Sequence, residues 1–122
     1  MDDMITAIDK KQAFKEAFSA YSFQAGFLKI ALLKMISEEA SHGYALIRKI
    51  ESITQKDWKP SPGSIYPALQ ELENKGLVES RTEERKIIYS ITERGELVLE
   101  ASMEHMKMVM SHLRNLLSDR EI

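Results

Sequence analysis

The residues whose types and spacing best fit a chemical task lie between positions 61 and 74. If this segment is a helix, its apolar residues share one side, and the other side presents Gly63, Pro67, Gln70 and Asn74, with Ser64 and Tyr66 at its leading edge. Short polar side chains on an exposed helix can bond base edges in the major groove of DNA. Glu71 and Glu73 flank this side, and their carboxylates are acceptable near phosphate only if they point away or accept a hydrogen bond from cytosine.

An ordinary solvated helix surface is the alternative interpretation of these residues. The preceding turn, Ser61-Pro62-Gly63-Ser64, favours a binding role. Gly63 allows a close approach of the backbone, and N–H groups at the start of a helix can donate to a phosphate oxygen. The segment is therefore a candidate nucleic-acid contact.

Catalytic chemistry finds little support in the sequence. His105 and His112 are seven residues apart, about 10.5 Å along a helix, and lack the His-x-x-x-His spacing of a metal site. Ser64 has no glycine two residues later, as a nucleophile elbow requires, and no phosphate-binding loop or dinucleotide fingerprint occurs. We therefore expect no enzyme, no metal and no cofactor.

Composition limits the remaining classes. The chain has 122 residues, 43% of them hydrophobic, and no cysteine, which fits one domain and excludes disulfide scaffolds. The N-terminal segment is acidic and no run of about 18 apolar residues occurs, so we expect a cytoplasmic protein that is neither secreted nor membrane-spanning. The net charge is −2, and only residues 42–94 are net positive, by one charge, so electrostatics alone does not indicate a nucleic-acid partner.

Helical periodicity predicts the N-terminal elements. An apolar stripe with steps of three and four residues comprises Phe14, Phe18, Tyr21, Ala25, Leu28, Leu32 and Met35. Gly26 is expected to break this stripe into helices at about 3–22 and 25–38. A third helix is expected from a Ser41 cap to about Gln55.

The central elements follow from capping and turn signals. A fourth helix, at about 64–75, is expected to have Ser64 as its N-cap, Pro67 at the third position and Gly76 as its left-handed terminator. Strands at 77–81 and 86–92 form a hairpin around residues 82–85, and Thr92 caps a last helix that ends near Ser118. The predicted fold class is mainly α with a small two-stranded β wing, a winged helix-turn-helix with N- and C-terminal dimerisation helices.

The last helix carries an apolar seam that predicts association. Steps of four and three residues place on one stripe Leu99, Met103, Met106, Met110, Leu113 and Leu117. Such a stripe must pack on the body, on another subunit or on both. We expect a homodimer in which Phe14, Phe18 and Tyr21 complement the seam. Methionine surfaces adapt to varied partners, which leaves open a small aromatic effector at the dimer interface, walled by Phe14, Phe18 or Trp58, although core packing is the stronger interpretation.

Three motifs then carry a family resemblance. The segments SHGYALIRKIES, SPGSIYPALQELENKGLVES and KIIYSITERGE, in this order and spacing, resemble the PadR-like family of winged-helix transcriptional regulators. The resemblance implies a homodimer that binds a palindromic operator on double-stranded DNA, with paired recognition helices in successive major grooves. It also implies wings near the flanking backbone, repression of transcription, and relief by an effector in some relatives.

The resemblance also implies individual DNA-binding residues. On the recognition helix and its lead-in turn these are Ser61, Ser64, Tyr66 and Gln70; near phosphate on the preceding helix is Tyr44; on the wing are Arg81, Arg85 and Lys86. The two tyrosines could equally be packing residues, and Glu83 and Glu84 could simply pair with the wing cations. The turn Thr-Glu-Glu-Arg lacks the glycine or proline that such wings often contain.

These observations predict three segments and one function. The segments are an N-terminal helix for dimerisation at 1–24, a winged-helix DNA-binding domain at 25–92 and a C-terminal dimerisation helix at 93–122. The predicted function is that of a sequence-specific DNA-binding transcriptional regulator, a repressor acting as a homodimer, with its recognition helix at about 64–75. The alternative is a winged-helix module that binds protein and no specific DNA, which would suit the acidic charge balance.

Overall fold

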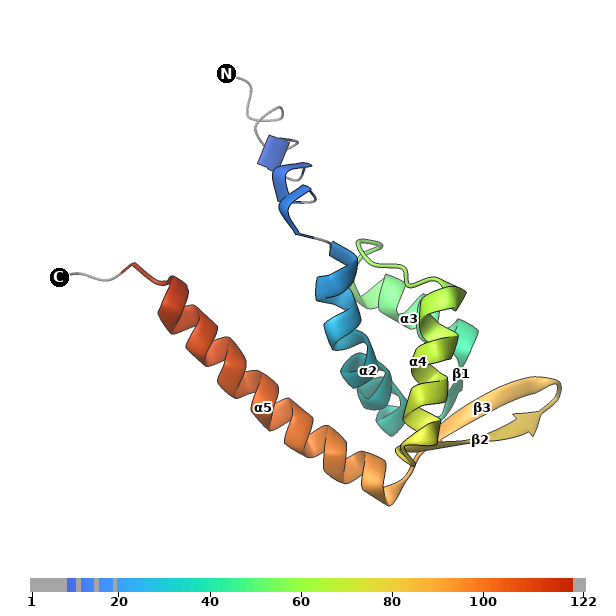
Figure 1. Cartoon of the computed structure of the whole chain (residues 1–122). Helices are drawn as coiled ribbons and strands as arrows, with labels where there is room; N and C mark the ends of the chain where they lie inside the picture. Colours follow the sequence, from blue (N-terminus) through green and yellow to red (C-terminus); the bar gives the residue numbers. More distant parts are fainter. Residues whose placement is uncertain (1–8, 11, 15, 19, 120–122) are drawn as a thin grey trace.

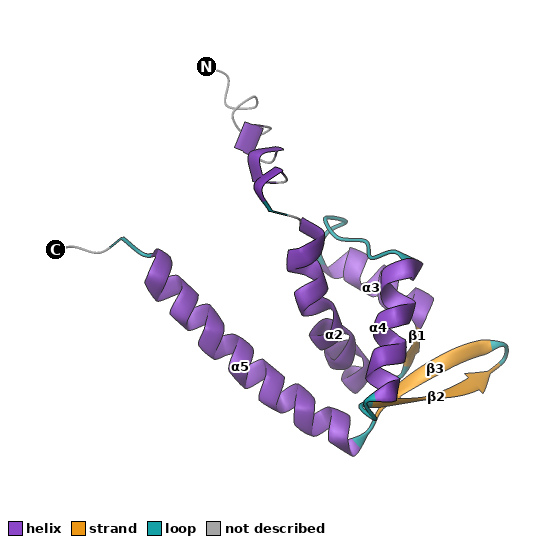
Figure 2. Cartoon of the chain, in the orientation of Figure 1, coloured by secondary structure: helices purple, strands orange, loops and turns teal. Residues whose placement is uncertain are grey.

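Three packed helices, a projecting hairpin and one long terminal helix make up the fold (Figure 1). The computed structural model describes residues 9–10, 12–14, 16–18 and 20–119. The elements in chain order are α2 (Ala20–Glu38), β1 (Ser41–His42), α3 (Gly43–Ile53), α4 (Pro62–Asn74), β2 (Val78–Glu83), β3 (Lys86–Ile91) and α5 (Glu93–Leu117). Figure 2 shows that the strands lie together beside the helices. This arrangement confirms the predicted mainly helical fold with a small β wing. None of the helices described is both long and apolar enough to cross a bilayer.

Aliphatic side chains from α2, α3, α4 and the first residue of β2 form the centre of the core. The fully buried ones are Leu32, Leu46, Ile65, Leu69 and Val78. On α4 the buried residues are the four predicted from periodicity, Ile65, Ala68, Leu69 and Leu72. The opposite side of α4 is therefore left at the surface.

The predicted break between the first two helices at Gly26 is wrong. α2 continues from Ala20 through Gly26 to Glu38, and the chain bends instead at Phe18. A Cβ atom at Gly26 would meet nothing within 4 Å, so this glycine serves no close approach. A glycine in a helix interior costs only about 1 kcal/mol relative to alanine, which the packing of α2 on the core outweighs. Residues 3–8, 11, 15 and 19 of the predicted first helix lie outside the described part of the chain.

The cap of α3 is His42 and not Ser41. The His42 Nδ1 atom accepts a hydrogen bond from the backbone N–H of Ala45 at 3.2 Å. Ser41 lies in β1, where it pairs with Tyr89 of β3, and its hydroxyl donates to the carbonyl of Glu39 at 2.9 Å. Sheet pairing therefore moves the start of the helix by one residue.

The cap of α4 is also different from the predicted one. Ser61 Oγ accepts from the backbone N–H of Ser64 at 3.2 Å, and Pro62 occupies the first helical position, where its missing N–H costs nothing. Pro67 consequently lies inside the helix and not at its third residue. Its ring removes the hydrogen bond that the Gly63 carbonyl would otherwise accept.

The end of α4 is as predicted. Gly76 adopts a left-handed conformation with φ of 73°. Its N–H donates to the carbonyl of Glu73 at 2.9 Å, and the N–H of Leu77 donates to the carbonyl of Leu72 at 3.0 Å. This pair of hydrogen bonds is a Schellman motif. The apolar side chains of Leu72 and Leu77, which usually accompany such a motif, are both buried.

The wing has three strands, not the predicted two. Its order is β1-β3-β2, with both pairs antiparallel. The hairpin turn contains only Glu84 and Arg85, with φ values of 49° and 68°, because Glu83 already pairs with Lys86. Two successive left-handed residues define a type I′ turn, which usually signals itself by Asn-Gly. Glu-Arg carries no such signal, so the predicted four-residue turn was too long.

The beginning of α5 is packed closely against the end of α4. Thr92 Oγ1 accepts from the N–H of Gly95 at 3.0 Å, as predicted for the cap, and donates to the carbonyl of Gly76 at 2.6 Å. A Cβ atom at Gly95 would stand 2.0 Å from the carbonyl oxygen of Leu77. Gly95 therefore permits a backbone-to-backbone approach that no other residue allows.

We expect Gly95→Ala to lower the free energy of unfolding by about 2–3 kcal/mol, because the new methyl group must displace backbone. Gly26→Ala makes the same chemical change in open space on α2 and should raise stability by about 0.5–1 kcal/mol. Urea denaturation followed by circular dichroism measures both. Equal effects of the two substitutions would contradict the close approach at Gly95.

Candidate nucleic-acid interface

The exposed side of α4 carries the first group of predicted DNA-binding residues. Ser61, Tyr66 and Gln70 are exposed, and Ser64 is half-buried beside the Ser61 hydroxyl, 3.2 Å away. The Gln70 Nε2 group donates to Asn74 Oδ1 at 2.9 Å, one helical turn further on. The structure thus places these four residues on one helix, between its N-cap Ser61 and Gln70.

The start of α3 lies next to this surface. The Tyr66 ring covers Gly43, so closely that a Cβ atom there would be 2.7 Å from a ring carbon. Tyr66 is nevertheless 46% exposed, so it packs on Gly43 and is still accessible at the surface. Tyr44 is exposed, and the guanidinium of Arg48 lies 5.9 Å from the centre of its ring. Arg48 was not among the predicted site residues, although its position four residues after Tyr44 places both on one face.

The wing carries the second group of predicted residues, at a distance along the chain from the first. Arg81 lies on β2 and its Nε donates to Glu83 Oε2 at 2.7 Å. Arg85 stands in the turn, and Lys86 begins β3 opposite Glu83. All of these side chains are exposed, and exposed ion pairs contribute little net free energy, so the cations can exchange partners.

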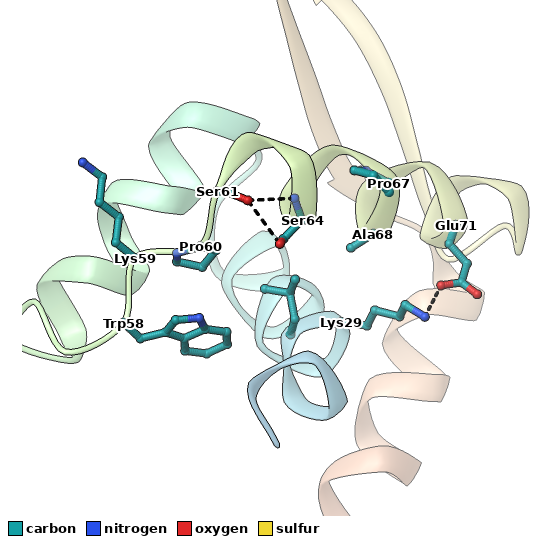
Figure 3. Close-up of a pocket in the computed structure, with 10 residues that line it drawn as sticks. Lys29, Trp58, Lys59, Pro60, Ser61, Ser64, Pro67, Ala68 and Glu71 are labelled. Atoms are coloured by element: carbon teal, nitrogen blue, oxygen red, sulfur yellow. Dashed lines mark hydrogen bonds and ion pairs between the residues drawn. The ribbon is translucent and has the colours of Figure 1, made fainter. Parts of the chain in front are cut away.

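Two carboxylates of α4 are held by partners within the protein. Glu71 accepts from Lys29 of α2, shown in Figure 3, and its second oxygen is 3.5 Å from the Nζ of Lys75. The hydrogen bond from Lys29 is the main cause that lowers the pKa of Glu71. Glu73 accepts from the Ser80 hydroxyl of β2 at 2.5 Å. Both carboxylates therefore have partners on the flanks of the helix. The charge of Glu71 is paired with two lysines, whereas the neutral Ser80 hydroxyl directs Glu73 toward the wing and leaves its negative charge in place.

A cavity of about 480 Å³ lies between α2, the segment that precedes α4, and α4 itself. Figure 3 shows its lining, which comes from α2, from the segment before α4 and from α4 itself; among these residues are Leu28, Lys29, Trp58, Pro60, Ser64 and Pro67. Thr54 Oγ1 accepts from the backbone N–H of Trp58 at 3.1 Å, and its hydroxyl is 2.8 Å from the carbonyl oxygen of Ile50, its nearest acceptor. Trp58 is partly buried and packs against the core.

The predicted dimer residues separate into buried and exposed ones. Leu99 is buried in the core of its own chain, and Met103 packs against that core. Further along α5, Met106 is half-buried, and the exposed members of the seam are Met110, Leu113 and Leu117. Phe14 and Phe18 are exposed, with ring centroids 5.9 Å apart. The side chain of Tyr21 lies outside the described part of the structure.

This architecture defines the class of the protein. Three compact helices, the last exposing a polar side, are followed by a β wing, which is the winged helix-turn-helix fold. In the described residues, no cluster of histidine and acidic side chains is arranged to hold a metal ion.

Comparison with known proteins gives the family. Residues 32–101 match the transcriptional regulator PadR-like family, and the chain belongs to this family. Its members are regulators and not enzymes, in agreement with the sequence-based expectation. The chain is 39% identical over 93 residues to the transcriptional regulator YqjI of Escherichia coli (strain K12). The matched region covers 75% of this chain and 45% of YqjI. The chain thus spans about half the length of this curated relative.

Solved structures agree with the fold. A PadR-like transcriptional regulator from Bacillus cereus superposes with a TM-score of 0.72 and 29% identity, covering 81% of this chain and 99% of that one. A transcriptional regulator from Clostridium thermocellum superposes with a TM-score of 0.75 at 22% identity, over 80% of this chain and 99% of that one, and shows the fold alone.

The lowered pKa of Glu71 predicts a pH-dependent contribution to stability. A depressed carboxyl pKa means that the ionised form stabilises the folded state above the ordinary glutamate range of about 4.3, and that this stabilisation is lost as pH falls. The free energy of unfolding of the wild type should exceed that of Glu71→Gln at about pH 7, and the difference should vanish in acid. Glu79→Gln, which removes an exposed carboxylate without a partner among the described residues, is the control and should show no such convergence.

Proposed function

We propose that this protein is a sequence-specific DNA-binding transcriptional regulator that acts as a homodimer and represses by occupying its operator. The observation that carries the proposal is the two-sided nature of α4. Its inner side is fully buried, its acidic residues are tied to partners, and its outer side presents Ser61, Tyr66 and Gln70. The cytoplasmic location expected from the sequence would follow from binding to chromosomal DNA.

In this proposal α4 enters the major groove, which at about 12 Å wide admits one helix. The Gln70 amide supplies a donor and an acceptor for base edges, and Ser64 and Tyr66 contact the groove wall. Tyr44 and the cation beside it, Arg48, face phosphate from α3. Arg81, Arg85 and Lys86 approach the backbone beside the groove, as point charges that do not read sequence.

The second part of the proposal is the dimer. The last turns of α5 expose Met110, Leu113, Leu116 and Leu117 together, at 51–74% of their surface. Full burial of such a side chain contributes roughly 1.5–3 kcal/mol, so these four favour a partner surface. A second copy offers the same stripe and the exposed Phe14 and Phe18, and two-fold pairing would separate the half-sites by about 34 Å, one turn of DNA.

The small aromatic effector remains a proposal. The cavity between α2 and α4 offers a place for it, because Trp58, Leu28 and Pro60 supply an apolar lining and ligand sites commonly have volumes of about 300–1,000 Å³. This cavity includes Trp58 but neither phenylalanine of the predicted interface site. An effector seated there would contact the same helix that meets DNA.

Variants on the two groups of contacts should separate their roles. Gln70→Ala should relax base preference at one position of the operator, with a discrimination loss of about 1–3 kcal/mol. Arg85→Ala should weaken binding to every duplex alike and reduce the dependence of log affinity on log salt by about one. Fluorescence anisotropy on operator and unrelated duplexes, at several salt concentrations, measures both.

The alternative, a protein-binding module, makes the opposite prediction for salt. A protein with six to ten phosphate contacts loses roughly a thousandfold or more in affinity between about 50 and 200 mM salt. Weak binding that does not change with salt, together with wild-type behaviour of both variants, would favour the module and exclude the DNA interface described above.

The dimer has its own test. Met110→Glu with Leu113→Glu places two charges in the exposed stripe and should convert the protein to a monomer in light scattering. His112→Glu with Asn115→Glu makes two exposed substitutions away from the centre of that stripe on the same helix and should leave the dimer intact. A dimer that persists in the first variant would show that α5 does not hold the subunits together.

A further inference from the structure

The recognition helix and the wing meet at a small cluster of polar and aromatic side chains. Tyr66 and Glu73 come from α4, two helical turns apart on one side, and Ser80 and Tyr89 are cross-strand partners on β2 and β3. The Ser80 hydroxyl donates to Glu73 Oε2 at 2.5 Å, a short bond of the charge-assisted kind. Within the described residues, this is the single side-chain hydrogen bond that joins α4 to the wing.

The negative charge of Glu73 also affects the pKa of Tyr89, the buried member of this cluster. Tyr89 is only 7% exposed, and its pKa is raised first by burial, then by the negative charge of Glu73 and by Tyr66. The carboxylate therefore faces the junction between helix and sheet. Its hydrogen bond to Ser80 directs it toward β2, although Gln70 lies one helical turn before it on α4.

The rest of the wing has few attachments to the body. On β2 only Val78 is buried, and residues 79–83 are all exposed. On β3 the first two residues, Lys86 and Ile87, are exposed as well. A hairpin with so little buried surface takes its direction from contacts at its base. The Glu73–Ser80 bond lies at that base.

We propose that Glu73 is a positioning residue for DNA binding: through Ser80 it sets the direction of the wing relative to α4, so that Arg85 and Lys86 meet the same duplex as Gln70. This inference rests on the DNA-binding function proposed above. It reverses the usual expectation, since a carboxylate near a polyanion should weaken binding and its removal should strengthen it. If the wing is already held in place in the free protein, binding does not have to include the entropic cost of ordering it, and the affinity is higher for that reason.

The experiment compares two alanine substitutions that remove one negative charge each. Glu73→Ala breaks the bond to Ser80. Glu79→Ala is the matched control, because Glu79 is exposed, adjoins Ser80 on β2 and points to the opposite side of the strand. Affinities are measured at one salt concentration for an operator selected from random duplexes and for an unrelated duplex, and protection of the backbone at the wing is measured by hydroxyl-radical footprinting.

We expect Glu79→Ala to bind both duplexes as tightly as the wild type or more tightly. Glu73→Ala should lose about tenfold in affinity for the operator, the equivalent of one charge-assisted hydrogen bond, with weaker protection at the wing. A similar loss is expected on the unrelated duplex, because the wing contacts the backbone and not the bases. Ser80→Ala changes no charge and should give the same loss, Ser80→Thr should retain binding, and the double variant Glu73→Ala/Ser80→Ala should lose no more than either alone.

Opposite outcomes overturn the inference. If Glu73→Ala binds the operator as tightly as Glu79→Ala does, Glu73 is only a charge near DNA. If the double variant loses the sum of the two single losses, the two residues act separately. If Glu73→Ala does not fold, Ser80→Ala and Ser80→Thr decide, and wild-type affinity in Ser80→Ala is the contradicting result. A wild-type protein that binds no duplex would instead refute the proposed function itself.

Discussion

The structure depends on one close approach of backbone segments, at the point where α4 ends and α5 begins. Gly76 turns the chain through its left-handed conformation, the Leu77 carbonyl accepts from the N–H of Thr92 at 3.1 Å, and the Thr92 hydroxyl returns to the Gly76 carbonyl. Gly95 has room for no side chain beside Leu77. Because α4, the base of the wing and the long terminal helix all start or end here, this junction holds their ends together, and the Glu73–Ser80 bond then joins the wing to the side of α4. In the proposed function, DNA reading by α4 and subunit pairing by α5 would both depend on the same few backbone atoms.

In the proposed function, charge placement is what allows an acidic protein to present a surface to DNA. The chain carries a net charge of −2, and no large excess of cations marks the proposed binding side. The acids of α4 are instead engaged by partners: Glu71 by Lys29 and Lys75, and Glu73 by Ser80. The cations of the wing and of α3 remain at the surface. Electrostatic complementarity of this kind is local, so the total charge is a poor guide to the partner.

Much of the fold follows from local signals in the sequence. The buried side of α4, the left-handed end at Gly76 and the Thr92 cap each depend on residues within one or two turns, and the structure has all three. The failures involve competition or distant partners. Ser61 and Ser64 are both good caps, and Pro62 at the first helical position favours the former. The strand at Ser41–His42 exists only because β3 lies beside it, and the continuity of α2 through Gly26 comes from tertiary packing. The candidate site residues could be predicted from their positions on the expected helices and strands. The approach of Arg48 to Tyr44 and the hydrogen bond between Ser80 and Glu73 are visible only in the folded chain.

The central claim is that two copies of this chain, paired through α5, read DNA with two α4 helices one turn apart. Selection of bound fragments from random duplex DNA, followed by sequencing, tests it most directly. The account predicts an enriched element with two-fold symmetry whose half-sites are centred about 34 Å apart, or 10 to 10.5 base pairs. Enrichment of a single asymmetric half-site, or no enrichment over the starting pool, would contradict it.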